Sequence, residues 1–187
     1  MPSNNSEALN ASGLTAEETK SLKERTAQSH EEKIIQSIKE LYTCKPSERT
    51  YEIYTSDAVF HDPIGIAEGI QSIRAQFNGL VKLFPRADIP SFRILENPPS
   101  LSKSTVLIDQ DVAYYRDPNA KSPTKVVNSL LTLQTNDEHK VTRHTEEWDH
   151  KRETTRDDGF LGMLNEQRKK ITASVTGMFI SQEPPAN

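Results

Sequence analysis

The carboxylate of Asp62 is the side chain in this sequence whose setting best suits proton transfer. It stands in His61-Asp62-Pro63, at the end of a short half-apolar run where Pro63 prevents further strand pairing. A carboxylate half-buried among apolar groups has a raised pKa, which suits a base that removes a proton from carbon and returns it. Alternatively, Asp62 only caps the turn into Ile64-Gly65, as aspartate before proline often does. The residues leave both interpretations open.

Three further candidates alternate along residues 139–149, which a period of two predicts to be a strand. His144, Glu146 and Trp148 share one face of that strand. Trp148 is too large and apolar to be left in water, so we expect this face to point inward and to bury His144 and Glu146. Buried polar groups need partners. The pair could therefore form an acid–base relay with Asp62, or a purely structural hydrogen-bond network.

A metal centre is not expected, although His61, Asp62, His144 and Glu146 are residue types that suit zinc or iron. His61 and Asp62 are neighbours in a strand and point to opposite faces, and no His-x-x-x-His spacing occurs. There is also no Gly-rich phosphate loop, no Gly-x-Ser-x-Gly elbow and no His-Glu-x-x-His helix. We therefore expect no metal and no cofactor.

The elements that must position these side chains are helices followed by strands. Apolar residues at helical spacing predict a helix from Ser29 to Pro46, a shorter one that carries Tyr51 and Tyr54, and a third from Glu68 to Phe84. Strands are predicted at 58–61, 87–96, 104–115, 124–135 and 139–149. Helices before a run of antiparallel strands indicate an α+β fold.

Segments on either side flank this domain, which spans residues 29–150. Residues 1–28 have too few apolar side chains to offset their ordering entropy and are predicted to be disordered. Residues 151–187 contain an amphipathic helix and a tail, which could dock on the domain or on a partner. Both faces of residues 126–133 are apolar, so we expect the outer face of that strand to be covered by a second copy of the chain or by the tail.

The composition narrows the possible partners and location. The 187 residues carry a net charge of −4, which gives no broad basic field, so neither nucleic acid nor an anionic membrane is an expected partner. There is no apolar stretch of the roughly 18 residues that would span a bilayer, no signal peptide, and only one cysteine, Cys44. We expect a soluble cytoplasmic protein. His30, His139 and His150 look like surface residues, and Asp109 and Asp111 like solvent-facing or sheet-edge charges.

From Tyr54 to Leu80 the sequence resembles SnoaL-like and ketosteroid-isomerase-like proteins of the nuclear transport factor 2-like superfamily. The resemblance covers about residues 30–150, and the elements that carry it are Tyr54, Asp57-Ala58, Asp62-Pro63, Gly69, Ile73 and the strands that follow. It implies a cone-shaped, curved antiparallel sheet wrapped around the N-terminal helices, with a pocket at one end. It also implies a homodimer through the outer face of the sheet.

Carried over residue by residue, the resemblance places Asp62 on the isomerases' proton-shuttling aspartate. Asn128 falls near the position of a protonated aspartic acid that donates to an oxyanion, if the turn at 135–138 holds three extra residues. The isomerases' oxyanion tyrosine has no counterpart, because its place goes to Ile38; Tyr42 lies one helical turn away. His144, Glu146 and Trp148 take pocket-lining positions.

These observations together predict a pocket for a small, largely apolar organic ligand, bound by Asn128, Trp148, Tyr54 and Phe77. Asp62, His144 and Glu146 are the expected catalytic residues of a cofactor-free isomerase, cyclase or dehydratase. The alternative is a non-enzymatic dimeric module that binds a ligand or a protein.

Overall fold

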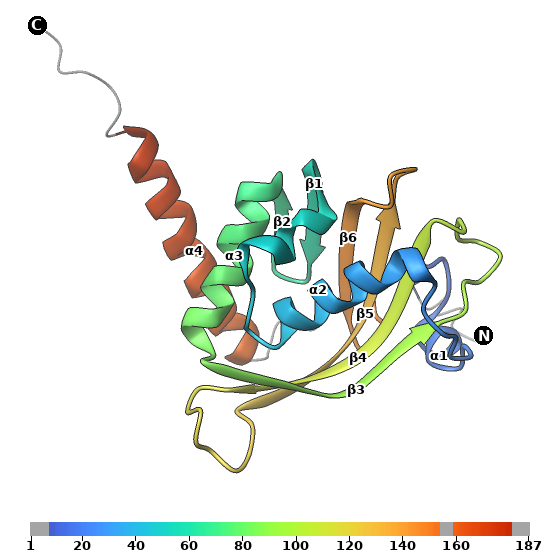
Figure 1. The fold of residues 1–187 in the computed structure, drawn as a ribbon. Coiled ribbons are helices and arrows are strands. Elements are labelled where there is room, and N and C mark those ends of the chain that lie inside the picture. Colours follow the sequence, from blue (N-terminus) through green and yellow to red (C-terminus); the bar gives the residue numbers. More distant parts are fainter. Residues whose placement is uncertain (1–7, 154–158, 181–187) are drawn as a thin grey trace, which may run out of the picture.

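The computed structural model of the protein describes residues 8–153 and 159–180, and the side chains of the last helix as far as Ile171. In this part of the chain, one six-stranded sheet with the order β2-β1-β6-β5-β4-β3 curves around the helix α2 (Figure 1). The strands are β1 (Tyr54–Asp62), β2 (Gly65–Glu68), β3 (Arg86–Leu95), β4 (Thr105–Tyr115), β5 (Lys125–Thr135) and β6 (Val141–Trp148). The predicted α+β cone is confirmed.

The strands β3 to β6 lie within two residues of their predicted bounds. By contrast, β1 is longer than the predicted 58–61, because it pairs on both edges, antiparallel with β2 and parallel with β6. The sequence does not predict β2, whose four residues are too few to show a period. The β1–β2 hairpin is the element that turns the chain at Asp62 and returns it toward the third helix.

The concave side of the sheet holds the helices that build the core. These elements are η1 (Ser29–Glu31), α2 (Glu32–Tyr42), η2 (Glu48–Ile53) and α3 (Ile70–Leu83). Ile38 and Leu41 of α2 and Ile73 and Phe77 of α3 are buried in the main cluster of apolar side chains. Full burial of such a side chain contributes about 1.5–3 kcal/mol, so the stripe that predicts each helix also fixes its inward face.

The last helix, α4 (Gly159–Ile180), runs beside α3 (Figure 1). Gly79 permits this approach, since a Cβ atom at position 79 would lie 2.3 Å from Ile171 Cδ1. Phe160 and Leu161 at the start of α4 are buried in the main core. The part of α4 as far as Ile171 therefore packs on its own domain. Residues 154–158 and 181–187 lie outside the described residues.

Residues 8–28, called here the N-terminal strap, are ordered against the sheet rather than disordered as predicted. The strap contains α1 (Ala16–Lys20), which begins with a capping box between Thr15 and Glu18. Its backbone continues along the end of β3, where the Arg25 amide donates to the Ile94 carbonyl. The prediction of disorder is thus wrong for 8–28, and residues 1–7 lie outside the described part of the chain.

Apolar contacts under the strap explain why β5 has two apolar faces. Leu130 of β5 is fully buried beside Leu95 and Leu107, and Leu22 of the strap and Leu101 pack against them. The chain's own N-terminal segment therefore covers this face, in place of the tail or the second copy that the sequence suggests. A homodimer through the remaining outer face stays a prediction.

A buried polar cluster also anchors the strap. His150 is fully buried, with Nδ1 2.9 Å from Thr19 Oγ1 and Nε2 2.9 Å from Asp109 Oδ1. Burial acts to raise the pKa of Asp109, but hydrogen bonds from His150, Arg93 and Asn128 outweigh it and hold that pKa well below its usual value. The surface positions expected for His150 and Asp109 are therefore wrong, because the strap covers them.

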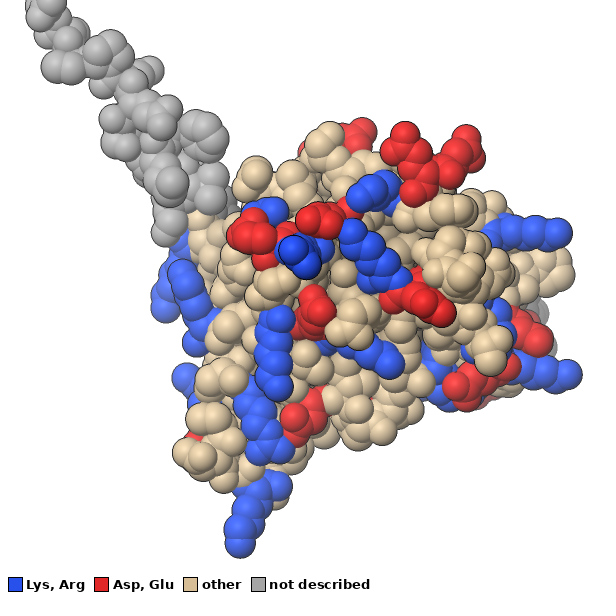
Figure 2. All heavy atoms as spheres, viewed as in Figure 1, with Lys and Arg blue, Asp and Glu red and all other residues tan. Residues whose placement is uncertain are grey.

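Acidic and basic side chains are interspersed over much of the face that Figure 2 shows. Across the described residues, no helix is long and apolar enough to cross a membrane.

Candidate active site

Asp62 ends β1 with its side chain turned toward the interior. Its Oδ1 accepts hydrogen bonds from the amides of Ile64 (2.9 Å) and Gly65 (3.0 Å), which close the turn into β2. The turn-capping role that the sequence suggests is therefore present. The same carboxylate also lines a cavity in the core, so capping does not exclude chemistry.

Arg168 of α4 reaches Asp62 from the other side. Its Nη1 lies 3.3 Å from Asp62 Oδ1, and its Nη2 donates to Gln76 Oε1 of α3 at 2.6 Å. Burial raises the pKa of Asp62, whereas the Arg168 charge and the amides of Gly65 and Ile64 act to lower it. Burial wins, and the pKa of Asp62 lies above its ordinary value.

Strand β6 places His144, Glu146 and Trp148 on the inner face of the sheet, as the alternation predicts. His144 is 0% exposed, and Glu146 and Trp148 are each 8% exposed. Glu147 on the opposite face is also buried, because it accepts the Ala11 amide of the strap (2.8 Å to Oε2). Alternation thus identifies which side chains enter the cone but not which ones the strap covers.

Glu146 is held by two donors. Tyr42 Oη donates to Oε2 at 2.8 Å, and Trp148 Nε1 donates to Oε1 at 3.2 Å. Burial, followed by the nearby charge of Asp62, raises the pKa of Glu146 to about 7. This carboxyl group can therefore gain and lose a proton at neutral pH.

His144 lies behind Tyr42. Its Nε2 is 3.3 Å from Tyr42 Oη and its Nδ1 is 2.8 Å from Tyr54 Oη. The rings of Phe60 and Phe77 pack against the imidazole, with centroids 4.8 and 6.2 Å away. Burial lowers the pKa of His144 to about 3, so the ring is neutral at physiological pH.

We call the space between these groups the inner cavity. It has a volume of about 70 Å³, and Asp62 and Glu146 line it together with Tyr42, Phe60, Phe77, Tyr114, Val127 and Trp148. The helix α4 closes it with the side chains of Phe160, Leu164, Gln167, Arg168 and Ile171. Two carboxyl groups from β1 and β6 therefore share one small, mostly apolar enclosure.

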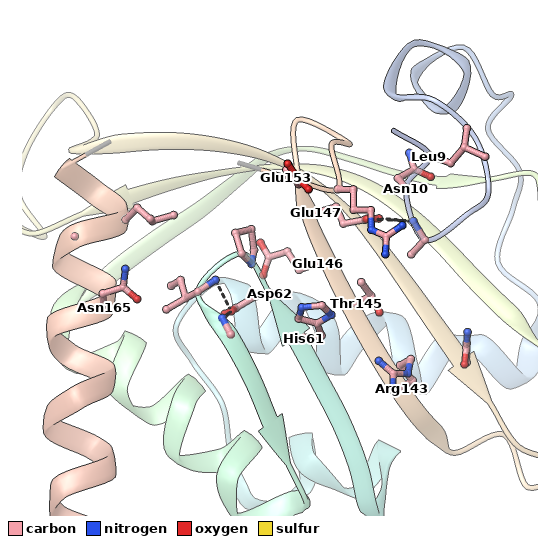
Figure 3. A pocket seen from close by; sticks show the side chains of 18 residues that line it. Leu9, Asn10, His61, Asp62, Arg143, Thr145, Glu146, Glu147, Glu153 and Asn165 are labelled. Carbon is pink, nitrogen blue, oxygen red and sulfur yellow. Dashed lines mark hydrogen bonds between the residues drawn. The ribbon is translucent and has the colours of Figure 1, made fainter. Parts of the chain in front are cut away.

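A wider depression, called here the outer groove, meets the inner cavity. It has a volume of about 1100 Å³, and the residues common to both spaces are Asp62, Ile64 and Glu146. Figure 3 shows Asp62 and Glu146 between the start of α4, which carries Asn165, and the outer face of β6, which carries Arg143. The two carboxyl groups thus lie where the groove meets the cavity.

The structure brings most, but not all, of the expected site residues together. Phe77 lines the inner cavity; Tyr54 does not, and instead binds His144. The prediction that Asn128 lies in the pocket is wrong. It lies on the outer face of β5, where Nδ2 donates to Asp109 Oδ1 (3.0 Å) and Asp111 Oδ1 (2.9 Å). The alternation in β5 gives the reason, since Val127 and Ser129 on either side of Asn128 are the buried residues of the inner face.

The sequence did not single out Tyr42, Tyr114 and Arg168 as site residues. Tyr42 is one of the buried residues on the inward face of α2, and its place in the helical apolar pattern was the available signal that it enters the core. Tyr114 and Arg168 depend on how α4 and β4 meet, which local patterns do not encode. Among the described residues, no group of three His, Cys, Asp or Glu side chains could hold a metal ion.

Comparison with known proteins identifies the fold. No protein-family model and no curated protein sequence matches the chain. A steroid Δ-isomerase from Pseudomonas aeruginosa matches with a TM-score of 0.54 and 10% identity, over 83% of this chain and 99% of that one. A de novo designed protein with a curved β-sheet matches with a TM-score of 0.53 and 11% identity, over 78% of this chain and 99% of that one.

An NTF2-like protein from Cytophaga hutchinsonii aligns less closely, with a TM-score of 0.47 and 13% identity over 66% of this chain and 93% of that one. The likeness to the isomerase shows that the chain has the ketosteroid-isomerase-like, nuclear transport factor 2-like fold that its sequence predicts. At such low identity the likeness concerns the fold alone, because this scaffold serves unrelated tasks.

Proposed function

We propose that this protein takes a small, largely apolar organic molecule with a polar end and carries out cofactor-free acid–base chemistry on it. The reaction types that fit are isomerisation, cyclisation, dehydration and epoxide opening. The observation that supports this proposal is that Asp62 and Glu146 line one mostly apolar cavity from two different strands. Two titratable groups in different environments are the usual basis of an acid–base pair.

The surroundings of the two carboxyl groups support one assignment of the base and acid roles. Asp62 has the Arg168 charge and two amides beside it, and these favour its anionic form, which is the form of a base. Glu146, with a pKa of about 7, holds the exchangeable proton for part of the time at neutral pH. Asp62 would remove a proton from carbon while the polar end of the ligand accepts the proton of Glu146. When Asp62 gives up its proton and Glu146 regains one, both carboxyl groups are again in their starting states.

Access requires movement of α4. Sites for drug-sized molecules have volumes of roughly 300–1000 Å³, far above the 70 Å³ of the inner cavity. The outer groove supplies the missing space next to the same carboxyl groups. We therefore propose that the ligand enters from the groove and displaces side chains of α4, such as Leu164, from the cavity.

The experiment begins with the natural ligand. Small molecules that co-purify with the protein are identified by mass spectrometry, and turnover of each is measured with wild-type protein, Asp62→Asn and Glu146→Gln. We expect both variants to lose turnover by at least 10²-fold, the usual contribution of a positioned acid or base. Asp57→Asn is the matched control, because Asp57 is an exposed carboxylate on the same strand. Full activity in Asp62→Asn would show that Asp62 is not the base.

A non-enzymatic binding module is the second candidate. The observation that favours it is the Arg168–Asp62 ion pair, which occupies the proposed base. In that case the ligand would bind without being changed, and the Asp62→Asn variant would bind it as well as the wild type does. A homodimer through the part of the outer sheet face that the strap leaves free belongs to this proposal too, and sedimentation equilibrium tests it.

A further inference from the structure

A chain of hydrogen bonds, called here the file, leads from the inner cavity into the core. It runs from Glu146 Oε2 to Tyr42 Oη (2.8 Å), on to His144 Nε2 (3.3 Å), and from His144 Nδ1 to Tyr54 Oη (2.8 Å). All four residues are at least 92% buried. Each hydroxyl has one proton, and a neutral imidazole has one N–H, so the protons along the file must all point the same way.

When Glu146 is ionised, only one arrangement satisfies every group. Tyr42 donates to the carboxylate and can then only accept from His144. Nε2 must therefore carry the imidazole proton, and the bare Nδ1 accepts from Tyr54. The donors all point toward Glu146.

When Glu146 is protonated, the order reverses. Trp148 Nε1 already donates to Oε1, so the proton belongs on Oε2, which faces Tyr42. Tyr42 accepts it and turns its own proton to Nε2, which must now be bare. The imidazole proton then sits on Nδ1 and points to Tyr54.

We propose that His144 is a positioning residue whose tautomer follows the protonation of Glu146, with the proton on Nε2 above the transition and on Nδ1 below it. The imidazole stays neutral in both states. The protons balance as follows. Glu146 takes up one proton from the outer groove, which it lines, and the Tyr42 hydroxyl turns from Oε2 to Nε2. The imidazole loses the proton on Nε2 and gains one on Nδ1, so the net uptake is one proton.

The groups around the file favour this exchange over the formation of an imidazolium ion. The titratable and charged groups that face it are Tyr42 from α2, Tyr51 from η2, Tyr54 and Asp62 from β1, Tyr114 from β4 and, beyond Asp62, Arg168 from α4. Burial raises the pKa of Tyr42, Tyr54 and Tyr114, so these residues stay neutral. Burial also acts against a charged ring at His144.

The inference deepens the proposed function, and in that respect rests on it. A buried carboxyl group that gains a proton would leave the Tyr42 hydroxyl facing another donor. Reversal of the file removes this conflict, because Tyr42 changes from donor to acceptor. Glu146 can then hold and release the proton of a ligand reversibly, and His144 serves this step without touching the ligand.

The experiment needs neither ligand nor turnover. Wild-type protein is labelled with ¹⁵N in histidine and ¹³C in the side chain of glutamate, and long-range ¹H–¹⁵N spectra are recorded from about pH 5.5 to 8.5. We expect the protonated nitrogen of His144 to change from Nδ1 to Nε2 as the pH rises, with the same midpoint as the ¹³C titration of Glu146, near pH 7.

Two variants locate the coupling. In Glu146→Gln nothing titrates at position 146, so the His144 tautomer should not change with pH. In Tyr42→Phe the Glu146 titration should persist, but the tautomer should no longer follow it. A wild-type His144 that keeps one tautomer, or takes up a second proton in this range, would overturn the inference. So would a Tyr42→Phe variant in which the coupling survives. Failure of the proposed catalysis would appear in the turnover of Asp62→Asn and would leave these spectra unchanged.

Discussion

Arg168 on α4 and Asp62 on β1 form an ion pair in the wall of the inner cavity, with 3.3 Å between Nη1 and Oδ1. The two residues are 106 positions apart in the chain, and their side chains are only 19% and 11% exposed. One contact therefore joins α4, the helix that closes the inner cavity, to the proposed base. This link makes the state of the helix and the proton affinity of the carboxyl group depend on each other.

Replacing Arg168 by Met should loosen α4 and raise the pKa of Asp62. The Arg168 charge and hydrogen bond act to lower that pKa, so their loss leaves burial less opposed, and the carboxyl group takes up its proton at a higher pH. We expect a loss of about 2 kcal/mol in stability, as for a hydrogen bond to a charged group. The pKa is measured by ¹³C NMR of Asp62, and the helix by amide hydrogen exchange.

Lys169→Met is the matched control for this change, because Lys169 is exposed and pairs only weakly with Glu166 on the same helix. An Asp62 pKa that is the same in Arg168→Met and in wild type would contradict the ion pair.

Glu146→Gln should make the protein more stable at pH 8 than the wild type is. The pKa of Glu146 rises from 4.5 to about 7 on folding, so the folded state binds more protons than the unfolded state between these values. The stability that Glu146 contributes is therefore present below pH 4.5 and is lost as the pH rises through 7. The size of the effect is roughly 3 kcal/mol.

Chemical denaturation of both proteins at several pH values measures this difference. His144, with its pKa lowered to about 3, makes stability rise with pH in the acid range, which is opposite to the effect of Glu146. Because His144 is present in both proteins, its effect cancels when the variant is compared with the wild type. Parallel curves for the two proteins would mean that Glu146 has an ordinary pKa.

Phe160→Ala should enlarge the inner cavity enough to admit a small aromatic molecule. Phe160 is buried against the rings of Phe84, Tyr114 and Trp148, and its loss should cost about 3–5 kcal/mol. Indole should restore part of that stability, since a ligand at 100 times its Kd adds about 2.7 kcal/mol.

The melting temperature with and without indole tests this. Met163→Ala serves as the control, because Met163 lies on the same helix and packs on the core but does not line the inner cavity. An equal response to indole in both variants would place the binding site elsewhere.

Asp109→Asn should release the N-terminal strap. The change weakens the hydrogen bonds to His150 and Arg93, which are charge-assisted, at a cost of about 2–4 kcal/mol. Faster amide exchange in residues 10–28 and faster tryptic cleavage there are the expected signs. Asp88→Asn breaks a more exposed ion pair with Arg86 and should have little effect. Protection that is unchanged in Asp109→Asn would show that the strap is held by its apolar contacts alone.

The sequence predicts the elements of the cone well because their patterns are local. Ile38 and Leu41 repeat at helical spacing, and His144, Glu146 and Trp148 alternate along a strand, so the period alone gives their inward face. Asn128 shows the limit of a resemblance. Its assignment to the pocket depended on an alignment with three extra residues in a turn, and a shift of one residue moves a side chain to the other face of a sheet.

The strap and the closing helix could not be predicted in the same way. Residues 8–28 have a composition typical of disorder, and what orders them is a set of partners far along the chain, such as His150 and Asp109. Arg168 is likewise one of several basic residues in an amphipathic segment, and only the approach of α4 to α3 at Gly79 brings it to Asp62. Contacts of this kind produce no periodic pattern in the sequence.

The strap also sets an order of events during synthesis on the ribosome. Asn10 Nδ2 binds the carbonyl of His150, and the Ala11 amide binds Glu147, which are 140 and 136 positions further along. These residues are made early and are thus among the last to find their places. Until β6 has left the exit tunnel, the row of leucines on β3, β4 and β5 remains uncovered, and in that interval the nascent chain offers chaperones a site that the finished protein hides.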